Sequence, residues 1–283
     1  MRPFTSLCVL TLLALAPIAK AQEVIHLWSK GQPGHEEMRK LPESAKDWWV
    51  RDIHNPSLTV YAPKSSEANG TAIILVPGGG HQNLVFTAEG VTPAQYLQGL
   101  GVTSFALKYV LARQQGSPYT IEGDAKADLT RAIRYVRAHA ADYGINPARI
   151  GVMGFSAGGE LTSMVAFNPT AADPNAADPI DRENGRPDFL IEIYPGPLGI
   201  PPVIDKAPPP AFLINAWDDR MAMADTDAIE RLYEAWPDVT LERHVLSGGK
   251  HGFNMGERST LKSVKDWRTR LADWLSDSGL LAH

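Results

Sequence analysis

A serine placed between glycines is the residue of this chain best suited to covalent chemistry. Ser156 lies at the centre of Gly154–Gly158, which has the pattern G-x-S-x-G. The apolar run Ile150–Phe155 precedes the serine, and residues with helical spacing, Glu160–Phe167, follow it. This arrangement predicts a sharp strand-to-helix turn that presents the serine oxygen at the end of a strand. Ser156 could then act as a nucleophile, and the backbone N–H of Ala157 could stabilise an oxyanion.

Ser156 needs a base to remove its proton, and the base needs an acid to fix its tautomer. Asp219 follows the predicted strand Ala211–Ala216 by three residues, and its neighbour Asp218 is the fallback for the same role. His251 lies among glycines after the next predicted strand, where a flexible loop can reach over the edge of the sheet. We therefore predict a catalytic triad of Ser156, Asp219 and His251.

A glycine-rich loop should complete the site. Pro77–Gly80, with three consecutive glycines, follows the apolar run 71–76 that predicts a central strand. Three consecutive glycines cost conformational entropy on folding, so a chain that has them usually needs its backbone close to a ligand at that position. We predict that the N–H of Gly79 or Gly80 joins that of Ala157 in an oxyanion hole. A phosphate-binding loop is the weaker alternative, because no G-x-G-x-x-G or G-K-[ST] pattern is present.

Strand and helix patterns alternate along most of the chain, which predicts a mostly parallel sheet with helices on both faces. The irregular segment Glu23–Pro63 should add edge strands and a strap over the domain. In the long predicted helix Glu122–Tyr143, apolar residues share one face, so Arg131, Arg134 and Arg137 should point outward. The predicted strands are 53–61, 71–76, 102–107, 150–155, 189–194, 211–216 and 239–246, and the predicted helices are 93–99, 122–143 and 160–167.

The first 21 residues are typical of an export signal. Arg2 precedes an apolar run too short for the roughly 20 residues that a bilayer-spanning helix needs. Ala19-Lys20-Ala21 resembles a signal peptidase site. Cys8, the sole cysteine of the sequence, lies in this segment, so we expect no disulfide or thiolate metal site after cleavage. We predict one catalytic domain over residues 22–283 and a secreted or periplasmic location.

The charge pattern indicates neither a nucleic-acid partner nor a bound cofactor. The sequence has 27 Lys and Arg against 32 Asp and Glu. Loss of Arg2 and Lys20 with the export signal leaves 25 against 32, a net charge of −7. No basic stripe is present, so we expect no nucleic-acid binding. The scattered histidines do not predict a metal site, and we expect no cofactor and no membrane association after signal cleavage.

Four segments together resemble the α/β-hydrolase superfamily: Pro77–Gly80, Gly154–Gly159, Ala216–Asp219 and Lys250–Phe253. Two others, His54–Tyr61 and Leu107–Tyr109, are similar to secreted bacterial carbohydrate esterases of the acetylxylan and feruloyl esterase-like group. The resemblance implies an α/β-hydrolase fold with the chain order serine, acid, histidine. A short Pro-rich segment, 195–210, stands where such relatives have a longer insertion, which implies little or no lid and an open cleft.

The function implied is that of a secreted serine esterase that works through an acyl-enzyme. We expect its substrate to be acylated plant cell-wall carbohydrate, in particular acetylated xylan. Feruloyl or general short-chain esters are alternatives, and a catalytically silent hydrolase-fold binding protein is an alternative of another class. Trp48 and Trp49 could line a carbohydrate site, although buried packing is the use that we expect.

Overall fold

The computed structural model describes residues 22–282, so the predicted export signal at 1–21 lies outside the described residues. Within them, eight strands form one sheet in the order β1-β4-β6-β5-β7-β8-β9-β10, and β2 and β3 form a separate pair. The strands are β1 Val24–His26, β2 Ser44–Ala45, β3 Val50–Arg51, β4 Ser57–Tyr61, β5 Ala72–Val76, β6 Thr103–Lys108, β7 Ile150–Phe155, β8 Phe189–Ile193, β9 Ala211–Ala216 and β10 Leu241–Leu246. From β6 to β10 all neighbours pair in parallel, whereas β4 and β1 extend the β6 edge antiparallel.

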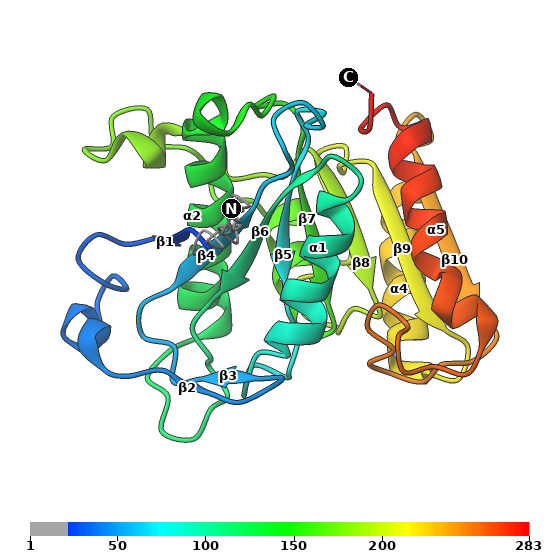
Figure 1. The fold of residues 1–283 in the computed structure, drawn as a ribbon, viewed down its shortest axis with the longest axis horizontal. Helices are drawn as coiled ribbons and strands as arrows, with labels where there is room; N and C mark the ends of the chain where they lie inside the picture. The colour runs from blue at the N-terminus through cyan, green and yellow to red at the C-terminus, as the bar shows by residue number, and fades with distance from the viewer. Residues whose placement is uncertain (1–21, 283) are drawn as a thin grey trace, which may run out of the picture.

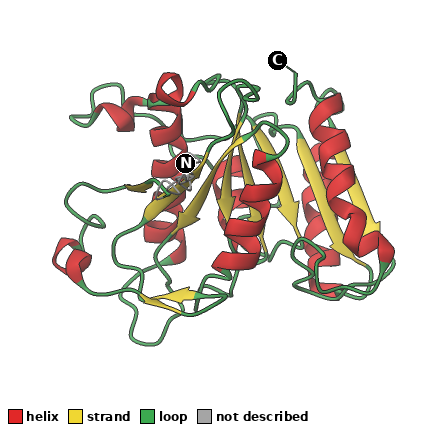
Figure 2. Ribbon diagram, in the orientation of Figure 1, coloured by secondary structure: helices red, strands yellow, loops and turns green. Residues whose placement is uncertain are grey.

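Helices cover both faces of this sheet (Figures 1 and 2). Successive residues of β5 point to opposite faces, so Ile74 and Val76 pack with α2, α3 and α4, whereas Ile73 and Leu75 pack with α1 and α5. The predicted sheet with helices on both faces is thereby confirmed. The helices are α1 Thr92–Gln98, α2 Lys126–Ala138, α3 Ala157–Phe167, α4 Arg220–Glu234 and α5 Lys262–Asp277.

The carboxyl ends of the parallel strands meet at one edge, where the arrowheads gather in Figure 2. The β2–β3 pair of the N-terminal strap lies at this edge too, because Val50 of β3 pairs with Leu84, in the loop after β5. The predicted strand Phe189–Tyr194 ends one residue early, since Tyr194 adopts a positive φ of 39°. Across residues 22–282, no helix has the length and apolar character needed to span a membrane.

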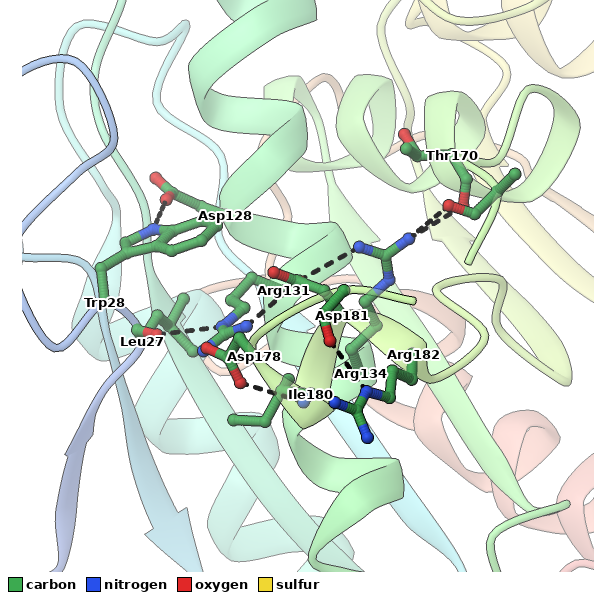
Figure 3. A network of polar contacts seen from close by, with 12 residues as sticks. Leu27, Trp28, Asp128, Arg131, Arg134, Thr170, Asp178, Ile180, Asp181 and Arg182 are labelled. Carbon is green, nitrogen blue, oxygen red and sulfur yellow. Dashed lines mark hydrogen bonds and ion pairs between the residues drawn. The ribbon is translucent and has the colours of Figure 1, made fainter. Parts of the chain in front are cut away.

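The prediction that the arginines of α2 point outward is wrong. Arg131 and Arg134 are buried, at 5% and 8% exposure, beneath the loop 168–188 that folds back over the helix. Arg131 binds Asp178 and Asp181, at 2.5 and 3.1 Å, and Arg134 also binds Asp181, at 3.2 Å (Figure 3). The acidic partners lie about 50 residues further along the chain, so the helical pattern gave no sign of them.

The predicted long helix Glu122–Tyr143 is also interrupted. It starts as a π-helical turn, Ile121–Ala125, continues as α2, and ends in a 3-10 turn, Ala140–Tyr143. Gly144 closes this run with a left-handed φ of 64°, a conformation that glycine adopts at little cost.

Candidate active site

Ser156 lies at a strained turn between β7 and α3. Its φ of 52° and ψ of −118° are unusual for a residue with a side chain. The turn can be this tight because Gly158 lacks a side chain: a Cβ there would lie 1.9 Å from the carbonyl oxygen of Val76. The end of β8 also fixes the turn, since the N–H of Ser156 donates to Ile193 O at 3.1 Å.

The serine hydroxyl is hydrogen-bonded to the predicted base. The distance from Ser156 Oγ to His251 Nε2 is 2.7 Å, and that from His251 Nδ1 to Asp219 Oδ2 is 2.6 Å. A carboxylate only accepts hydrogen bonds, so Nδ1 carries the proton and Nε2 is free to accept the one on Ser156. The structure thus brings together the three predicted residues, with the tautomer that a general base requires.

The two neighbouring aspartates have different contacts. Asp219 is buried at 7% exposure and, besides contacting His251, accepts a hydrogen bond from the N–H of Ala222 at the start of α4. Asp218 accepts hydrogen bonds from the N–H groups of Gly249 and Lys250, at 3.4 and 2.8 Å. These bonds, the one from Lys250 foremost, lower the pKa of Asp218. Asp218 therefore fixes the backbone of the histidine loop, and Asp219 orients the imidazole.

The glycine loop supplies backbone donors next to the serine. Gly79 has a φ of 125°, and a Cβ there would lie 1.9 Å from Asn83 O, so only glycine fits. Among the described residues, no atom accepts a hydrogen bond from the N–H groups of Gly79, Gly80 or Ala157. Gly79 and Gly80 line the same cleft as Ser156 and His251. These N–H groups are accordingly available to bind an oxyanion at the positions predicted.

A cleft of about 660 Å³ lies beside the triad. Trp48, which we expected to be buried, is 52% exposed and lines this cleft. The strap that carries Trp48 is attached to the segment before α1, because the hydroxyl of Thr87 donates a hydrogen bond to Asp47 O at 2.7 Å. The remaining lining residues come mainly from 85–92 and from the loop after His251, and they include Val85, Ala88, Tyr194, Asn254, Glu257 and Arg258.

Three acidic residues near the site, Glu89, Glu160 and Asp225, received no catalytic role from the sequence, and no motif includes Glu89 or Asp225. Glu89 accepts a hydrogen bond from the N–H of Gly78 at 2.7 Å, and burial raises its pKa to about 7. Glu160 in α3 binds buried His81, with 2.7 Å between Oε2 and Nε2, and so ties the glycine loop to the nucleophile helix. Burial, together with the charges of Glu160 and Asp219, raises the pKa of Asp225 to about 6.

A family model, BD-FAE, matches residues 58–212, more than half of the chain. The chain belongs to the BD-FAE family. The matched region contains the glycine loop and Ser156 but ends before Asp219 and His251. The match therefore covers the segments that carry the glycine loop and Ser156, and the structure brings Asp219 and His251 next to them.

Relatives of this BD-FAE chain include an acetylxylan esterase and an acetyl ester-xyloside bifunctional hydrolase. An acetylxylan esterase of Xylanibacter ruminicola is 31% identical over 208 residues, which are 66% of this chain and 42% of that protein. The chain thus spans less than half the length of this curated relative. The crystal structure of an acetyl ester-xyloside bifunctional hydrolase from Caldicellulosiruptor lactoaceticus is 27% identical, covers 93% of this chain and 99% of its own, and has a TM-score of 0.73.

The α/β-hydrolase fold follows from these structural matches. Thermogutta terrifontis esterase 2, in a structure phosphoramylated by tabun, superposes with a TM-score of 0.69 at 22% identity, over 96% of this chain and 100% of its own. At that identity the likeness bears on the fold alone. Together with the Caldicellulosiruptor structure, it confirms the predicted fold class.

Proposed function

We propose that the protein is a serine hydrolase that cleaves carboxylic esters through an acyl-enzyme. The observation that carries this proposal is the hydrogen-bonded chain from Ser156 Oγ through His251 to Asp219, with distances of 2.7 and 2.6 Å. The order of these contacts gives each residue one role: Ser156 is the nucleophile, His251 the general base and Asp219 the acid that orients the base.

In the proposed reaction, His251 Nε2 takes the proton of Ser156 as Oγ attacks the ester carbonyl carbon. The carbonyl oxygen becomes an oxyanion, and the N–H groups of Ala157 and of Gly79 or Gly80 bind it. His251 returns the proton to the alkoxide oxygen as the alcohol leaves, so that an acyl-serine remains. Water then attacks with the help of His251, which releases the carboxylic acid and restores Ser156.

The substrate that we propose is an acetylated carbohydrate such as acetylated xylan. An acetyl group fills only a small part of a cleft of about 660 Å³, so the remaining space suits a bulky alcohol. Trp48 presents an exposed aromatic face along this space, and such faces pack well on the apolar side of a sugar ring. The similarity to the Xylanibacter acetylxylan esterase and to the Caldicellulosiruptor acetyl ester-xyloside hydrolase favours the same chemistry.

We also propose that the protein is exported, which agrees with a polymeric cell-wall substrate outside the cell. The support for export is the sequence of residues 1–21 alone. N-terminal sequencing of the protein recovered from periplasmic and culture fractions tests it. A mature chain beginning at Gln22 is the expected result, and an intact Met1 in the cytoplasmic fraction would contradict it.

A panel of esters tests the substrate. Release of acetate from acetylated xylan is measured beside hydrolysis of p-nitrophenyl acetate, p-nitrophenyl esters of longer acids, and methyl ferulate. We expect acetate release and preference for acetyl among the p-nitrophenyl esters. Faster cleavage of methyl ferulate would favour the feruloyl alternative, and activity confined to long-chain acyl esters would refute the proposed substrate.

Covalent labelling separates an enzyme from a silent binding protein. A p-nitrophenyl phosphonate should add one phosphonyl group per chain, seen by intact mass, and release one equivalent of p-nitrophenol. Ser156→Ala should abolish labelling and lower turnover by at least about 10⁴-fold, because the nucleophile is lost while the fold is kept. A wild-type protein that is folded but takes no label would favour the binding protein.

A further inference from the structure

Glu89 is a buried carboxylate that is hydrogen-bonded to the glycine loop. It belongs to a π-helical turn, Thr87–Val91, that leads into α1, and only 3% of it is exposed. π-Helical turns are rare and are often found at functional sites. Among the described residues, Glu89 has no ion-pair partner, so its carboxylate is stabilised by hydrogen bonds alone.

One side of this carboxylate holds the glycine loop. Glu89 Oε2 accepts a hydrogen bond from the N–H of Gly78 at 2.7 Å. Gly78 immediately precedes the two glycines whose N–H groups are candidates for the oxyanion hole. It also lies against the nucleophile, since a Cβ at Gly78 would be 2.9 Å from that of Ser156. Movement of Gly78 would therefore change the aim of the oxyanion donors.

The other side of the carboxylate holds the histidine loop. Glu89 Oε1 accepts a hydrogen bond from the hydroxyl of Tyr194 at 2.9 Å. That hydroxyl also accepts a hydrogen bond from the backbone N–H of Asn254 at 3.1 Å. The Tyr194 ring packs on the imidazole of His251, with ring centroids 4.9 Å apart. With its amide nitrogen turned toward Glu89, Asn254 also donates to Oε1 at 2.7 Å.

We propose that Glu89 is a positioning residue for ester hydrolysis, whose carboxylate keeps the oxyanion loop and the histidine loop in register through Gly78, Tyr194 and Asn254. This inference rests on the proposed esterase function. Glu89 reaches the wall of the cleft, but its two oxygens are engaged by these protein donors, so it acts through the groups that contact the substrate. The positive φ of Tyr194, 39°, is the local strain that accompanies this link.

Asp128 provides a matched control for a buried carboxylate. It accepts one backbone N–H, from Val110 at 3.1 Å, and one side-chain donor, Trp28 Nε1 at 2.7 Å. It is fully buried, as Glu89 nearly is, and burial raises its pKa to about 8. Its partners lie outside the cleft. Asp128→Asn therefore makes the same carboxyl-to-amide change at a buried, hydrogen-bonded position without touching either catalytic loop.

The experiment compares the wild type with Glu89→Gln, Asp128→Asn and Tyr194→Phe. Melting temperatures, kcat and KM for p-nitrophenyl acetate are measured for each variant. For Glu89→Gln we expect kcat to fall about 10- to 100-fold and KM to change less than about threefold, since small displacements of catalytic groups act mainly on the transition state. Asp128→Asn should keep the wild-type kcat even if its melting temperature falls as much as that of Glu89→Gln.

Amide hydrogen exchange gives a second readout that does not depend on turnover. In Glu89→Gln, peptides covering 77–86 and 250–256 should exchange faster, whereas Asp128→Asn should leave both unchanged. Tyr194→Phe should loosen 250–256 and tests the link from its other end if Glu89→Gln does not fold. Unchanged exchange at both segments would overturn the proposal even in an active enzyme, and equal kcat losses in Glu89→Gln and Asp128→Asn would reduce Glu89 to a structural role. A wild type without esterase activity would instead overturn the proposed function, and the exchange result would still decide the link.

Discussion

Two polar networks of this molecule are built on opposite principles. The catalytic rim is the set of loops at the carboxyl edge of the sheet, and the arginine clamp is Arg131, Arg134 and Arg137 of α2 with Asp178, Asp181 and Asp188. The clamp joins regular helix to a loop through permanently charged arginines. The rim joins the glycine loop to the histidine loop through Glu89, a carboxyl group whose pKa burial raises to about 7.

Backbone strain separates the two networks as well. Over residues 22–282, six residues other than glycine have positive φ, and five of them belong to the rim: His81, Ser156, Tyr194, Lys250 and Asn254. The arginines of the clamp come from the regular helix α2. Strain of this kind persists only where the surroundings fix it, and it is typical of sites that orient groups for chemistry. The rim thus fixes the orientation of the groups around Ser156, whereas the clamp holds the loop 168–188 against α2.

The largest expected effect comes from replacing the two neighbouring aspartates of the rim, Asp219 and Asp218, one at a time by asparagine. Asp219→Asn removes the acceptor that fixes the tautomer of His251, so kcat for p-nitrophenyl acetate should fall about 10⁴-fold with little change in KM. The measurement is steady-state kinetics together with circular dichroism, which should show an unchanged fold.

Asp218→Asn is the internal control, because Asp218 contacts only the backbone of Gly249 and Lys250 in that loop. Loss of such surface hydrogen bonds should lower kcat less than about 10-fold. If Asp218→Asn were the more damaging change, the assignment of the acid would have to pass to Asp218, the fallback that the sequence offered.

Acidification should affect the rim before the clamp. Burial raises the pKa of Glu89 to about 7, so protonation at lower pH removes one of its acceptor oxygens. The titratable groups that face it, Tyr194 and Tyr109, have pKa values raised well above 10 by burial and stay neutral. Arg258 contacts the far side of Asn254, and Glu160 and Asp219 act on the same two tyrosines. The ratio of kcat/KM for the wild type to that for Glu89→Gln should rise about 10-fold from pH 6 to pH 8. A flat ratio would contradict the role of Glu89.

The clamp should hold through the same range. Partial burial opposes ionisation of Asp178, but the hydrogen bonds from Arg131 and from the N–H of Ile180 outweigh it and lower the pKa overall. A lowered folded-state pKa means that this contribution to stability is present above the ordinary pKa of 3.8 and is lost as the pH falls below it. Limited proteolysis of the loop 168–188 should therefore be unchanged between pH 8 and pH 5.

The sequence predicted the rim better than the clamp for a physical reason. Ser156, Asp219 and His251 each lie just after a strand, so one rule about parallel sheets brings them to the same edge. The clamp depends on acids about 50 residues from their arginines, in a loop without any periodicity, and a helix pattern carries no information on what covers its polar face. Glu89 was missed for a similar cause, because its role depends on donors from three separate segments.

Removal of an arginine should cost stability without affecting catalysis. Arg131 also donates to Leu27 O at 3.1 Å and lies 5.1 Å from the Trp28 ring, so it fastens the N-terminal segment to α2 (Figure 3). Arg131→Met keeps an unbranched apolar stem but removes the guanidinium group, so that these acceptors are left unpaired. Since its acidic partners are partly exposed, we expect a loss of about 1–3 kcal/mol in the free energy of unfolding, measured with urea, at unchanged kcat.

Arg270→Met is the matched control for that loss. Arg270 is 61% exposed and pairs with Asp273 at 3.2 Å along one helix, so its removal should cost less than about 0.5 kcal/mol. Equal losses in the two variants would mean that the burial of Arg131 adds nothing, and a large fall in kcat for Arg131→Met would join the two networks that we have separated.

The smallest expected effect concerns the outer part of the rim. Trp48→Ala removes an aromatic face from the cleft wall, so KM for acetylated xylo-oligosaccharides should rise about 10-fold, the range typical of an exposed tryptophan in a binding surface. KM for p-nitrophenyl acetate should stay within about twofold, because we expect so small an ester to be bound mainly beside Ser156. Trp217→Ala is the control: this residue has the same exposure, 52%, but stacks with Arg220 outside the residues that line the cleft. If both variants raised KM alike, or if neither did, the sugar would have to bind elsewhere on the rim, whereas a selective effect of Trp48 extends the catalytic rim to the N-terminal strap.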